Sequence, residues 1–462
     1  MTFASLDFVV FLLVVLLLYR LLPFRGQNLM LLAASLVFYG WWDWRYLGLL
    51  LLSALTDATA SARIAATGDP GRRRAWLLVS LGVNLGVLGL FKYLDFFVQS
   101  AGDLLGLFGL HPPLPLLHLV LPVGLSFFTF QSMAYTIDVY RRRTEVVSTF
   151  DHLRFVAFFP VLLAGPIERH DHLLEQLRRP RRVTAEHVYR GVILILWGLF
   201  KKVVVADNLG PYVDAVYGNV GAHGGASVVL ATYLFAFQIY CDFSGYSDMA
   251  VGLARLMGIE LVFNFQAPYL ARDIQEFWRR WHVSLSTWLR DYVFLPLGGA
   301  FEPGAREVRN ILLVFLACGL WHGASWTYVI WGALHGIYLL IWRLRGKRPP
   351  RRGIARWIAI AITFHQVLFA WLFFRAGSLT QAGEVLRALG RPGPLFNQPL
   401  LANALFPLLL MIGLEIVKDP LQLDEWLLRR RAWVTLALGL LVVFLIVMFA
   451  AQAGLSFIYF KF

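Results

Sequence analysis

Long apolar runs, separated by short polar and basic segments, dominate the chain. Residues 9–18 and 436–448 are apolar on every face of a helix, so they show no amphipathic stripe. A helix of this kind either is buried in a large protein or spans a membrane. Because such runs recur throughout 462 residues, of which 58% are hydrophobic, the pattern predicts an all-α, polytopic integral membrane protein.

The apolar runs predict about eleven membrane-spanning helices. We expect these spans at 8–22, 28–43, 46–61, 75–98, 116–138, 186–206, 227–247, 311–342, 357–374, 401–417 and 433–451. The run 311–342 is too long for one simple span, so we expect it to be broken. Asp7, and not a basic residue, precedes the first run, which we interpret as a retained span and not a cleaved leader.

The basic residues predict how the chain is oriented in the membrane. The net charge is +14, which in a soluble protein would suggest nucleic-acid binding, but here the basic residues fall between the apolar runs. Clusters occur at Arg63 with 72–74, and at 141–143, 178–182, 343–356 and 429–431. By the positive-inside rule these loops are cytoplasmic, and eleven spans then put the N-terminus outside. The stretch from Ser100 to Pro115 would lie on the opposite side from the basic loops.

Two segments depart from the simple pattern. Between Arg272 and Asp291 the charges are too many for a lone span, yet aromatic and aliphatic residues recur at intervals of 3, 4, 3 and 4 from Trp278 to Tyr292. We expect a helix there, folded into the protein interior, with His282 at the edge of its apolar face. The segment from Cys241 to Met249 inserts two acids, two serines and a glycine into an apolar run, and we expect broken backbone bordering a passage.

His322 is the main candidate for chemistry, because the run from Ile311 to Trp342 contains no Asp, Glu, Lys or Arg. An ionisable group at membrane depth is costly and indicates a functional site, although a lone buried His is more often a neutral, hydrogen-bonded core residue. In one continuous helix His322 and His335 would point about 140° apart, which argues against a shared metal ligand set. Cys241 and Cys318 have no metal-ligand spacing, so we predict neither a metal centre nor a disulfide.

Several strings of residues then carry a resemblance to a known family. They are Phe158-Phe159-Pro160 with Ala164-Gly165-Pro166-Ile167, Phe200-Lys201-Lys202-Val203-Val204 with Ala206-Asp207-Asn208, 242–250, Asn264-Phe265 with Pro268-Tyr269, 276–282 with 288–292, 296–299, 319–324, and Phe373-Phe374-Arg375-Ala376. In this order the chain resembles the membrane-bound O-acyltransferase superfamily. The nearest likeness within it is to the bacterial alginate O-acetyltransferase membrane subunits, while teichoic acid D-alanyltransferases and cellulose or peptidoglycan acetyltransferases look similar.

The resemblance implies one integral membrane domain over 1–462, with a motif-rich core at about 120–376, spans and broken or re-entrant helices, and a central tunnel. It implies that His322 is the family's near-invariant histidine and His282 its second position, often His or Asn in relatives. Other tunnel candidates are Trp321, Asp242, Ser244, Tyr246, Asp248, Trp281, Arg290 and Asp291. Candidates to hold donor phosphates are Arg279 and Arg280, and less strongly Lys201 and Lys202.

The chemistry of such a site fits acyl transfer from a thioester to a hydroxyl. The hydroxyl loses a proton as it attacks, and an imidazole is the usual acceptor, so His322 is the expected general base. His282 ranks first as donor to the oxyanion, ahead of the Trp281 or Trp321 N–H and backbone N–H groups, and a covalent acyl-histidine route stays open. We expect acetyl-CoA as donor and no tightly bound cofactor.

We expect a bacterial inner-membrane enzyme that acts on an exported polysaccharide such as alginate, directly or through a periplasmic SGNH-like or acetyl-relay partner. Membrane lipid and acyl-CoA are the other expected partners, and nucleic acid is not. Alternative acceptors are other cell-wall glycans or exopolysaccharides, modified with acetyl or D-alanyl groups. The rivals from other classes are a carrier that moves an acyl carrier or glycan without chemistry, and a scaffold that tolerates loss of His322.

Overall fold

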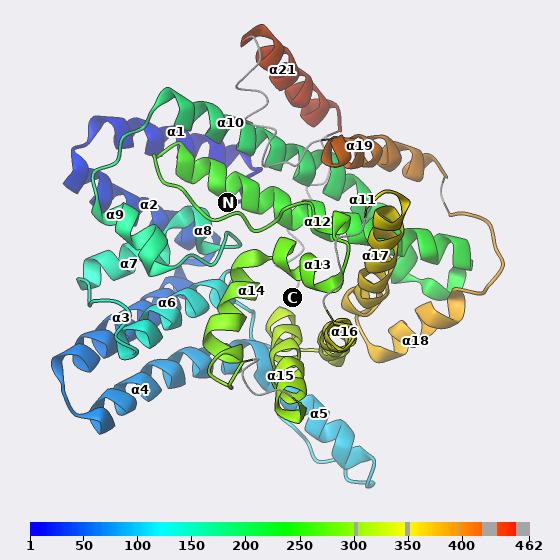
Figure 1. The fold of residues 1–462 in the computed structure, drawn as a ribbon, viewed down its shortest axis with the longest axis horizontal. Helices are drawn as coiled ribbons and strands as arrows, with labels where there is room; N and C mark the ends of the chain where they lie inside the picture. Colours follow the sequence, from blue (N-terminus) through cyan, green and yellow to red (C-terminus); the bar gives the residue numbers. More distant parts are fainter. Residues whose placement is uncertain (300–303, 347–351, 397, 418–431, 450–462) are drawn as a thin grey trace. The chain divides into compact units, whose positions relative to one another are not determined.

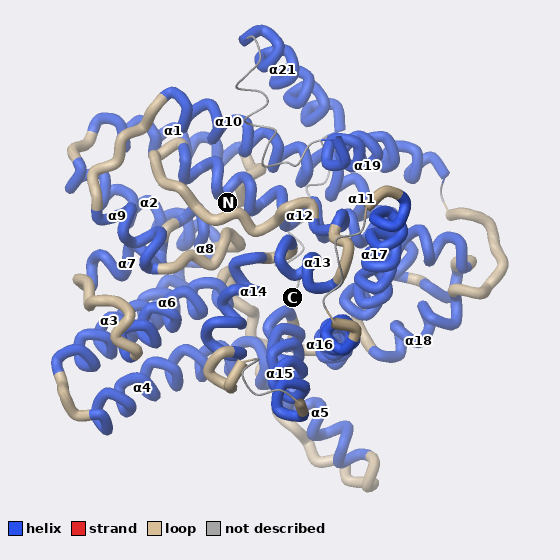
Figure 2. The backbone as a smooth tube through the Cα atoms, viewed as in Figure 1, coloured by secondary structure: helices blue, strands red, loops and turns tan. Residues whose placement is uncertain are grey.

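The computed structural model describes residues 1–299, 304–346, 352–396, 398–417 and 432–449. These residues form helices joined by loops, with no strand among them (Figures 1 and 2). The all-helical prediction is confirmed for this part of the chain. The basic cluster at 429–431 and part of that at 343–356 lie outside it.

The chain divides into two compact units, of which unit 1 comprises Met1–Gly191 and Leu253–Val262. Its helices are α1 (Leu6–Leu21), α2 (Phe24–Asp43), η1 (Trp44–Tyr46), α3 (Leu47–Ala66), α4 (Pro70–Leu88), η2 (Gly89–Tyr93), α5 (Leu94–Gly106), α6 (Leu125–Tyr140), α7 (Thr149–Ala157), α8 (Phe159–Leu162), η3 (His170–Leu174) and α9 (Glu175–Arg178). Helices α3, α4 and α6 pack together. The buried Arg73 guanidinium donates to the carbonyls of Ile64 and Tyr140 at 2.7 and 2.8 Å, which joins the ends of α3 and α6.

Unit 2 comprises Val192–Gly252 and Phe263–Phe462. Its helices are η4 (Phe200–Ala206), α11 (Asp207–Gly218), η5 (Val220–Ala222), η6 (Pro268–Leu270), α13 (Ile274–Arg280), α14 (Val283–Leu289), η7 (Arg290–Phe294), α15 (Ala305–His322), α16 (Trp326–Leu344), α17 (Ile354–Arg375), α18 (Leu379–Ala388), α19 (Gln398–Val417) and α21 (Ala432–Phe449). Helices α10 (Ala185–Leu199) and α12 (Gly225–Arg255) belong to both units. All of the histidine and tryptophan candidates lie in unit 2.

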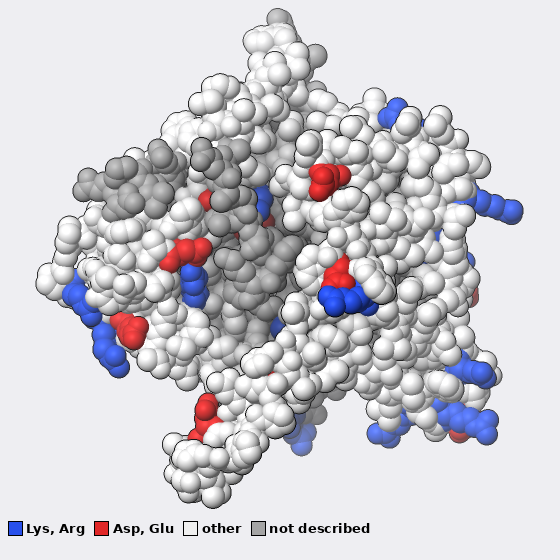
Figure 3. All heavy atoms as spheres, turned by 180° about the vertical axis from the view of Figure 1, so that it is seen from behind, with Lys and Arg blue, Asp and Glu red and all other residues white. Residues whose placement is uncertain are grey.

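The predicted count of eleven spans is not confirmed. In the described part of the chain, four helical stretches are long and apolar enough to cross a membrane: Phe24–Ala66, Pro70–Gly106, Gly225–Arg255 and Ile354–Arg375. Shorter apolar helices occur at Leu405–Ile416 and Trp433–Phe449. Most of the face drawn in Figure 3 carries neither acidic nor basic side chains. Leu13 and Val447 are among many exposed apolar residues on long helices, as expected of surfaces that face lipid.

Two predicted boundaries in unit 1 are wrong. The expected loop from Ser100 to Pro115 begins later, because α5 continues to Gly106. The expected span at 116–138 is helical only from Leu125, since the chain is irregular up to Gly124, which has φ of +78°. A Cβ atom at Gly124 would lie 2.3 Å from the carbonyl oxygen of Leu162, so only glycine fits this start.

Candidate active site

His322 is the last residue of α15, and only Gly323 to Ser325 separate it from α16. The expected break in the run 311–342 is therefore confirmed, but it forms a helical hairpin and not one interrupted span. An ion pair between Glu307 and Arg343 joins the start of α15 to the end of α16. His322 and His335 lie on different helices, so the separation of about 140° predicted for one continuous helix does not apply. The described residues nevertheless contain no group of three His, Cys, Asp or Glu able to hold a metal.

Glycines let the two arms of the hairpin touch through their backbones. A Cβ atom at Gly319 would lie 2.2 Å from the carbonyl oxygen of Tyr328, and one at Gly332 would lie 2.2 Å from that of Phe315. At Gly323 an added Cβ would meet the Tyr328 ring, again at 2.2 Å. Small residues at such crossings let helix backbones approach closely. The hairpin therefore holds His322 in one position relative to α16.

One hydrogen bond sets the tautomer of His322. Its Nδ1 atom lies 2.7 Å from the backbone carbonyl oxygen of Cys318, one helical turn earlier, and the side chain is buried. A carbonyl oxygen only accepts, so Nδ1 carries the proton in the neutral ring. The lone pair then belongs to Nε2, the atom that a general base uses. A helix-borne histidine oriented by its own backbone is ready to take a proton from a substrate hydroxyl.

His282 occupies a break between two short helices, where a single helix over 272–291 had been expected. That expectation is wrong: α13 ends at Arg280, α14 begins at Val283, and His282 between them has φ of +42°. The first residues of α14 are held by Asn264. Its backbone and side-chain oxygens accept from the N–H groups of Val283 and Ser284, each at 3.1 Å. Left-handed backbone at a non-glycine residue costs about 1–3 kcal/mol and often accompanies function.

The break brings the two histidines together. Their ring centroids are 6.4 Å apart, and the ring of Trp321 lies 5.6 Å from His282 and 5.0 Å from His322. Phe243 of α12 lies 4.7 Å from the His282 ring, and Trp331 of α16 lies 4.8 Å from that of His322. Both histidines are buried. The structure thus joins residues forty positions apart in the sequence, a convergence that the sequence left open.

A cavity of about 150 Å³ lies along α15, and one of its lining residues, Cys318, carries the carbonyl oxygen to which His322 donates. It is lined by Trp278, Ser286, Leu289, Arg290, Phe294, Ile311, Val314, Phe315, Cys318, Leu339 and Arg343. The buried Cys318, which holds His322, lies at its inner end, and the exposed Arg290 marks its outer end. Pockets for drug-sized ligands usually have about 300–1,000 Å³, so this cavity is too small for a whole ligand of nucleotide size.

The segment from Asp242 to Asp248 is not broken, contrary to expectation. It lies within the continuous helix α12, because its acids find cationic partners on the π-helical turn η4. Lys202 Nζ lies 2.7 Å from Asp242 and 2.7 Å from Asp207, and Lys201 Nζ lies 2.6 Å from Asp248. Lys201 also donates to Ser244 Oγ at 2.9 Å.

Backbone contact makes these pairs possible. A Cβ atom added at Gly245 would lie 2.6 Å from the carbonyl oxygen of Gly198, so α12 and the end of α10 touch there. Burying a paired charge is tolerable, whereas an unpaired one is costly. Both lysines are therefore engaged with buried carboxylates, which leaves their ammonium groups less available to a phosphate. Tyr246 on the same helix is buried as well.

The remaining candidates lie around α13 and η7. Arg279 is exposed, while Arg280 is tied to the Glu276 carboxylate at 2.7 Å and to the Gln266 carbonyl at 3.3 Å. Arg290 donates to Asp291 at 2.7 Å. Trp281 is fully buried, and its ring lies 5.0 Å from that of Phe265. Arg279 and Arg290 are thus the basic side chains of this set that are exposed.

Comparison with known proteins identifies the family. The model of MBOAT, the membrane-bound O-acyltransferase family, matches residues 36–380. A protein of Pseudomonas putida described as a probable alginate O-acetylase, AlgI, is 41% identical over 378 residues, which cover 80% of this chain and 76% of that protein. The chain belongs to the membrane-bound O-acyltransferase family.

Two further relatives of this membrane-bound O-acyltransferase differ in their named acceptors. A peptidoglycan O-acetyltransferase of Helicobacter pylori is 36% identical over 391 residues, or 78% of this chain and 73% of that protein. A teichoic acid D-alanyltransferase of Streptococcus thermophilus is 31% identical over 284 residues, or 54% of this chain and 68% of that protein. The protein is therefore a multi-pass membrane O-acyltransferase, and a carrier or scaffold without chemistry is set aside.

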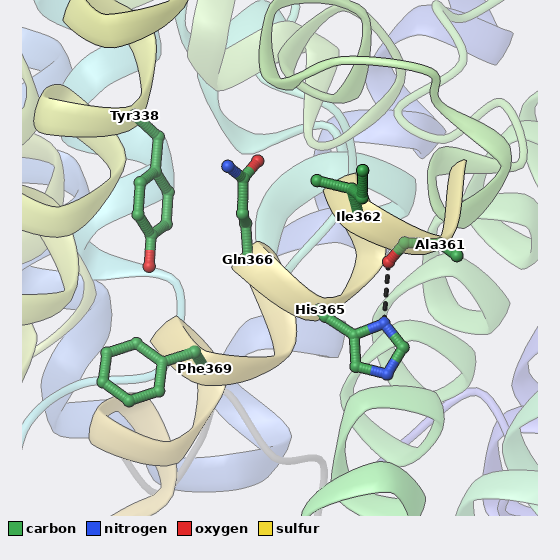
Figure 4. Close-up of a pocket in the computed structure, with 6 residues that line it drawn as sticks. All are labelled: Tyr338, Ala361, Ile362, His365, Gln366 and Phe369. Atoms are coloured by element: carbon green, nitrogen blue, oxygen red, sulfur yellow. Dashed lines mark hydrogen bonds between the residues drawn. The ribbon is translucent and has the colours of Figure 1, made fainter. Parts of the chain in front are cut away.

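The sequence did not single out three features of the O-acyltransferase site. Each contacts a candidate histidine: the Cys318 carbonyl, the Phe243 ring and the Trp331 ring. Apolar residues within apolar runs do not stand out in the sequence, so no pattern indicated these contacts. A second, open pocket lies on α16 and α17, where Tyr338, Gln366 and Phe369 are among its lining residues (Figure 4). His365 there donates from Nδ1 to the Ala361 carbonyl at 2.7 Å, and Tyr233 lies 2.6 Å from its Nε2. Both nitrogens are engaged, so this pocket is not the candidate active site.

Proposed function

We propose that the protein transfers an acetyl group from cytoplasmic acetyl-CoA to hydroxyl groups of an exported polysaccharide such as alginate. The transfer is direct or passes through a periplasmic acetyl-carrying partner of the SGNH type, and the membrane is the bacterial inner membrane. The named activities of the relatives from P. putida and H. pylori, both O-acetylations of glycans, support this acceptor class.

The observation that carries the proposal is the position of His322 beside the inner end of the cavity. The thioester enters along the cavity, and the acceptor oxygen forms a bond to its carbonyl carbon while its proton passes to Nε2 of His322. The C–S bond then breaks, the carbonyl re-forms, and the thiolate takes the same proton from the imidazolium. The step releases no net proton, so the site needs no separate proton exit.

Charge develops on the thioester oxygen during this step. His282, whose ring is 6.4 Å from that of His322, is the donor that we propose for this oxyanion. The nucleotide portion of acetyl-CoA stays outside the cavity, because about 150 Å³ is well below the volume of pockets that usually hold a ligand of that size. Arg279 and Arg290, whose side chains are exposed, are the proposed partners of the donor's phosphates, since guanidinium groups bind phosphate in a bidentate way.

The hairpin gives a depth for the chemistry. Asn310 follows the last charged residue of α15, and His322 comes twelve residues later, or roughly 18 Å along a helix at ~1.5 Å per residue. A bilayer core is about 30 Å thick. His322 would therefore lie near the middle of the membrane, reachable by donor and acceptor from opposite faces.

A second candidate reaction is transfer of a D-alanyl or acetyl group to another cell-wall acceptor. The identity of 31% to a teichoic acid D-alanyltransferase supports it. The reaction keeps the thioester and the hydroxyl and changes only the acyl group and the acceptor. The same His322 step serves both, so substrate comparison is what separates them.

The test is release of thiol by the purified, membrane-embedded protein. Wild-type protein is given acetyl-CoA with alginate, peptidoglycan or cellulose oligosaccharides, with and without an acetyl-carrying partner of the SGNH type, and free CoA is measured. We expect turnover that His322→Ala lowers about 10²- to 10⁴-fold, because a general base contributes that much. His365→Ala serves as the matched control, since that histidine is exposed on α17 away from the cavity.

Three outcomes decide the matter. Loss of turnover in His322→Ala with retention in His365→Ala supports the proposal. Retention of more than about a third of the activity in His322→Ala would remove this residue from the mechanism, given the size of the usual loss. Absence of thiol release by the wild type with every acceptor would overturn the proposed donor.

A further inference from the structure

Four tryptophans around the candidate active site keep their indole N–H groups buried without an acceptor. Within the described residues, Nε1 of Trp278, Trp281, Trp331 and Trp371 has no hydrogen-bond partner. An indole N–H only donates, and leaving such a donor unpaired in the interior costs free energy. Each unpaired group in a native structure therefore needs an explanation, such as a ligand that supplies the acceptor.

Trp331 differs from the other three by its neighbour. Its ring centroid lies 4.8 Å from that of His322, and the two rings meet at 66°. Within the described part of the chain, the rings of Trp278, Trp281 and Trp371 contact other aromatic residues and not His322. Trp331 is also fully buried. Of the unpaired donors, it is the one beside the proposed base.

The hairpin fixes this donor as firmly as it fixes the base. Trp331 directly precedes Gly332, and His322 follows Gly319 by three residues. These glycines touch, because the Cβ of one would lie 3.4 to 3.5 Å from the Cα of the other and much closer to a facing carbonyl. Stacking against Trp371, at 5.8 Å and 22°, adds a second constraint. A donor that does not reorganise during the reaction is what stabilisation of a transient charge requires.

We propose that Trp331 is a further catalytic residue, whose indole N–H donates to the thioester oxygen as that oxygen becomes negative. This inference rests on the proposed acyl transfer. When the acceptor oxygen bonds to the carbonyl carbon, the C=O electron pair moves onto the oxygen and the Trp331 N–H binds it. When the C–S bond breaks, the carbonyl re-forms and the hydrogen bond weakens. Trp331 gives up no proton, and His322 carries the only proton that moves.

The test compares two matched substitutions. Trp331→Phe and Trp197→Phe make the same chemical change, each removing a buried indole N–H that has no described acceptor. Only Trp331 lies against His322, whereas the ring of Trp197, on α10, stacks on Phe200. We expect Trp331→Phe to lower kcat for CoA release about 10²- to 10³-fold with KM changed less than about twofold, as for loss of one oxyanion donor. Trp197→Phe is expected to keep kcat within about threefold of the wild type, because it removes no contact with the reacting atoms or with Trp331.

A second variant separates packing from hydrogen bonding. Replacing Trp331 with the benzothienyl analogue of tryptophan puts sulfur where the N–H was and keeps the ring size, so it tests the donor even if Trp331→Phe fails to fold. We expect the same fall in kcat. Normal kcat in this analogue, or equal losses in Trp331→Phe and Trp197→Phe, would overturn the inference.

The proposed function is tested separately by the wild type in the same assay. Turnover by the wild type and its loss in His322→Ala leave the proposed function standing whatever Trp331 does. If the wild type releases no thiol, the acyl-transfer proposal itself fails. The two failures are therefore distinguishable.

Discussion

Single hydrogen bonds and single dihedral angles decide the chemistry of this O-acyltransferase site. His322 is oriented by its own helix, through the Cys318 carbonyl at 2.7 Å, and needs no partner from another segment to fix its tautomer. His282 is oriented by a kink, in which φ of +42° turns its ring toward Phe243 and Trp321. The position of the proposed base thus depends on a regular helix, and that of the second histidine depends on a break in one.

The break at His282 predicts how substitutions there will behave. Asn keeps a hydrogen-bond donor of similar size and, like His, is enriched in left-handed backbone, whereas Ala offers neither. We expect His282→Asn to keep at least about a tenth of wild-type kcat and His282→Ala to lose about 10²- to 10³-fold, as for an oxyanion donor. Thiol release by the two variants is the measurement. Equal losses would show that titration of the ring matters, and the donor-only role would be wrong.

At the scale of elements, glycine contacts position the helices that carry the site. Helices α15 and α16 meet through Gly319 and Gly332, and α10 meets α12 through Gly198 and Gly245. In a bilayer the hydrophobic effect does not drive helices together, so close packing of small residues has to do so. The Lys201 and Lys202 ion pairs add to the contact between η4 and α12. Helix α12 in turn places Phe243 against His282.

This packing predicts a strong asymmetry between two Gly→Ala substitutions. At Gly319 the added Cβ would lie 2.2 Å from a backbone oxygen that cannot rotate away, and overpacking of this kind typically costs about 1–3 kcal/mol. At Gly413 in α19 nothing lies within 4 Å, so Ala should be neutral or slightly stabilising. We expect Gly319→Ala to lower both Tm in detergent and kcat, and Gly413→Ala to lower neither. Unchanged Tm in Gly319→Ala would contradict the close contact.

At the scale of the whole molecule, basic residues at the ends of helices predict which ends face the cytoplasm. The ends of α3 and α6 are joined by Arg73, so the exposed Arg72 and Arg74 lie at one end of that bundle. Arg306, Arg309 and Arg345 lie at the open end of the α15–α16 hairpin, opposite His322. The positive-inside rule predicts that both basic ends are cytoplasmic.

Cysteine labelling checks this orientation. With Cys241 and Cys318 replaced by Ala, single cysteines at positions 74, 345 and 108 are treated with a membrane-impermeant reagent in intact spheroplasts. Position 108 carries an exposed Phe in the loop after α5, the side expected to be external. We expect labelling at 108 in intact spheroplasts, and at 74 and 345 only after permeabilisation. Labelling of 74 or 345 from outside would reverse the orientation and the proposed direction of transfer.

The sequence by itself determined the all-helical membrane class and the family of this protein. The apolar runs are long enough to span a membrane, where a helix satisfies the hydrogen bonds of its own backbone. The motif strings identify the O-acyltransferase family. The break between the two arms of 311–342 was also foreseeable, because that run exceeds the length of one span. His322 stood out since an ionisable residue in such a run is costly.

Only the tertiary structure decided how those segments meet. The acids of α12 led to the prediction of broken backbone along a passage. Their cationic partners come from η4, about forty residues earlier in the chain, and local sequence cannot show that pairing. The spacing of aromatic residues over 272–291 indicated one helix. Instead a second helix, α14, begins where Asn264 accepts from the Ser284 N–H and His282 has left-handed backbone. The approach of His282, His322 and Trp331 depends on helix breaks and glycine contacts, which are long-range consequences of packing and not of any local pattern.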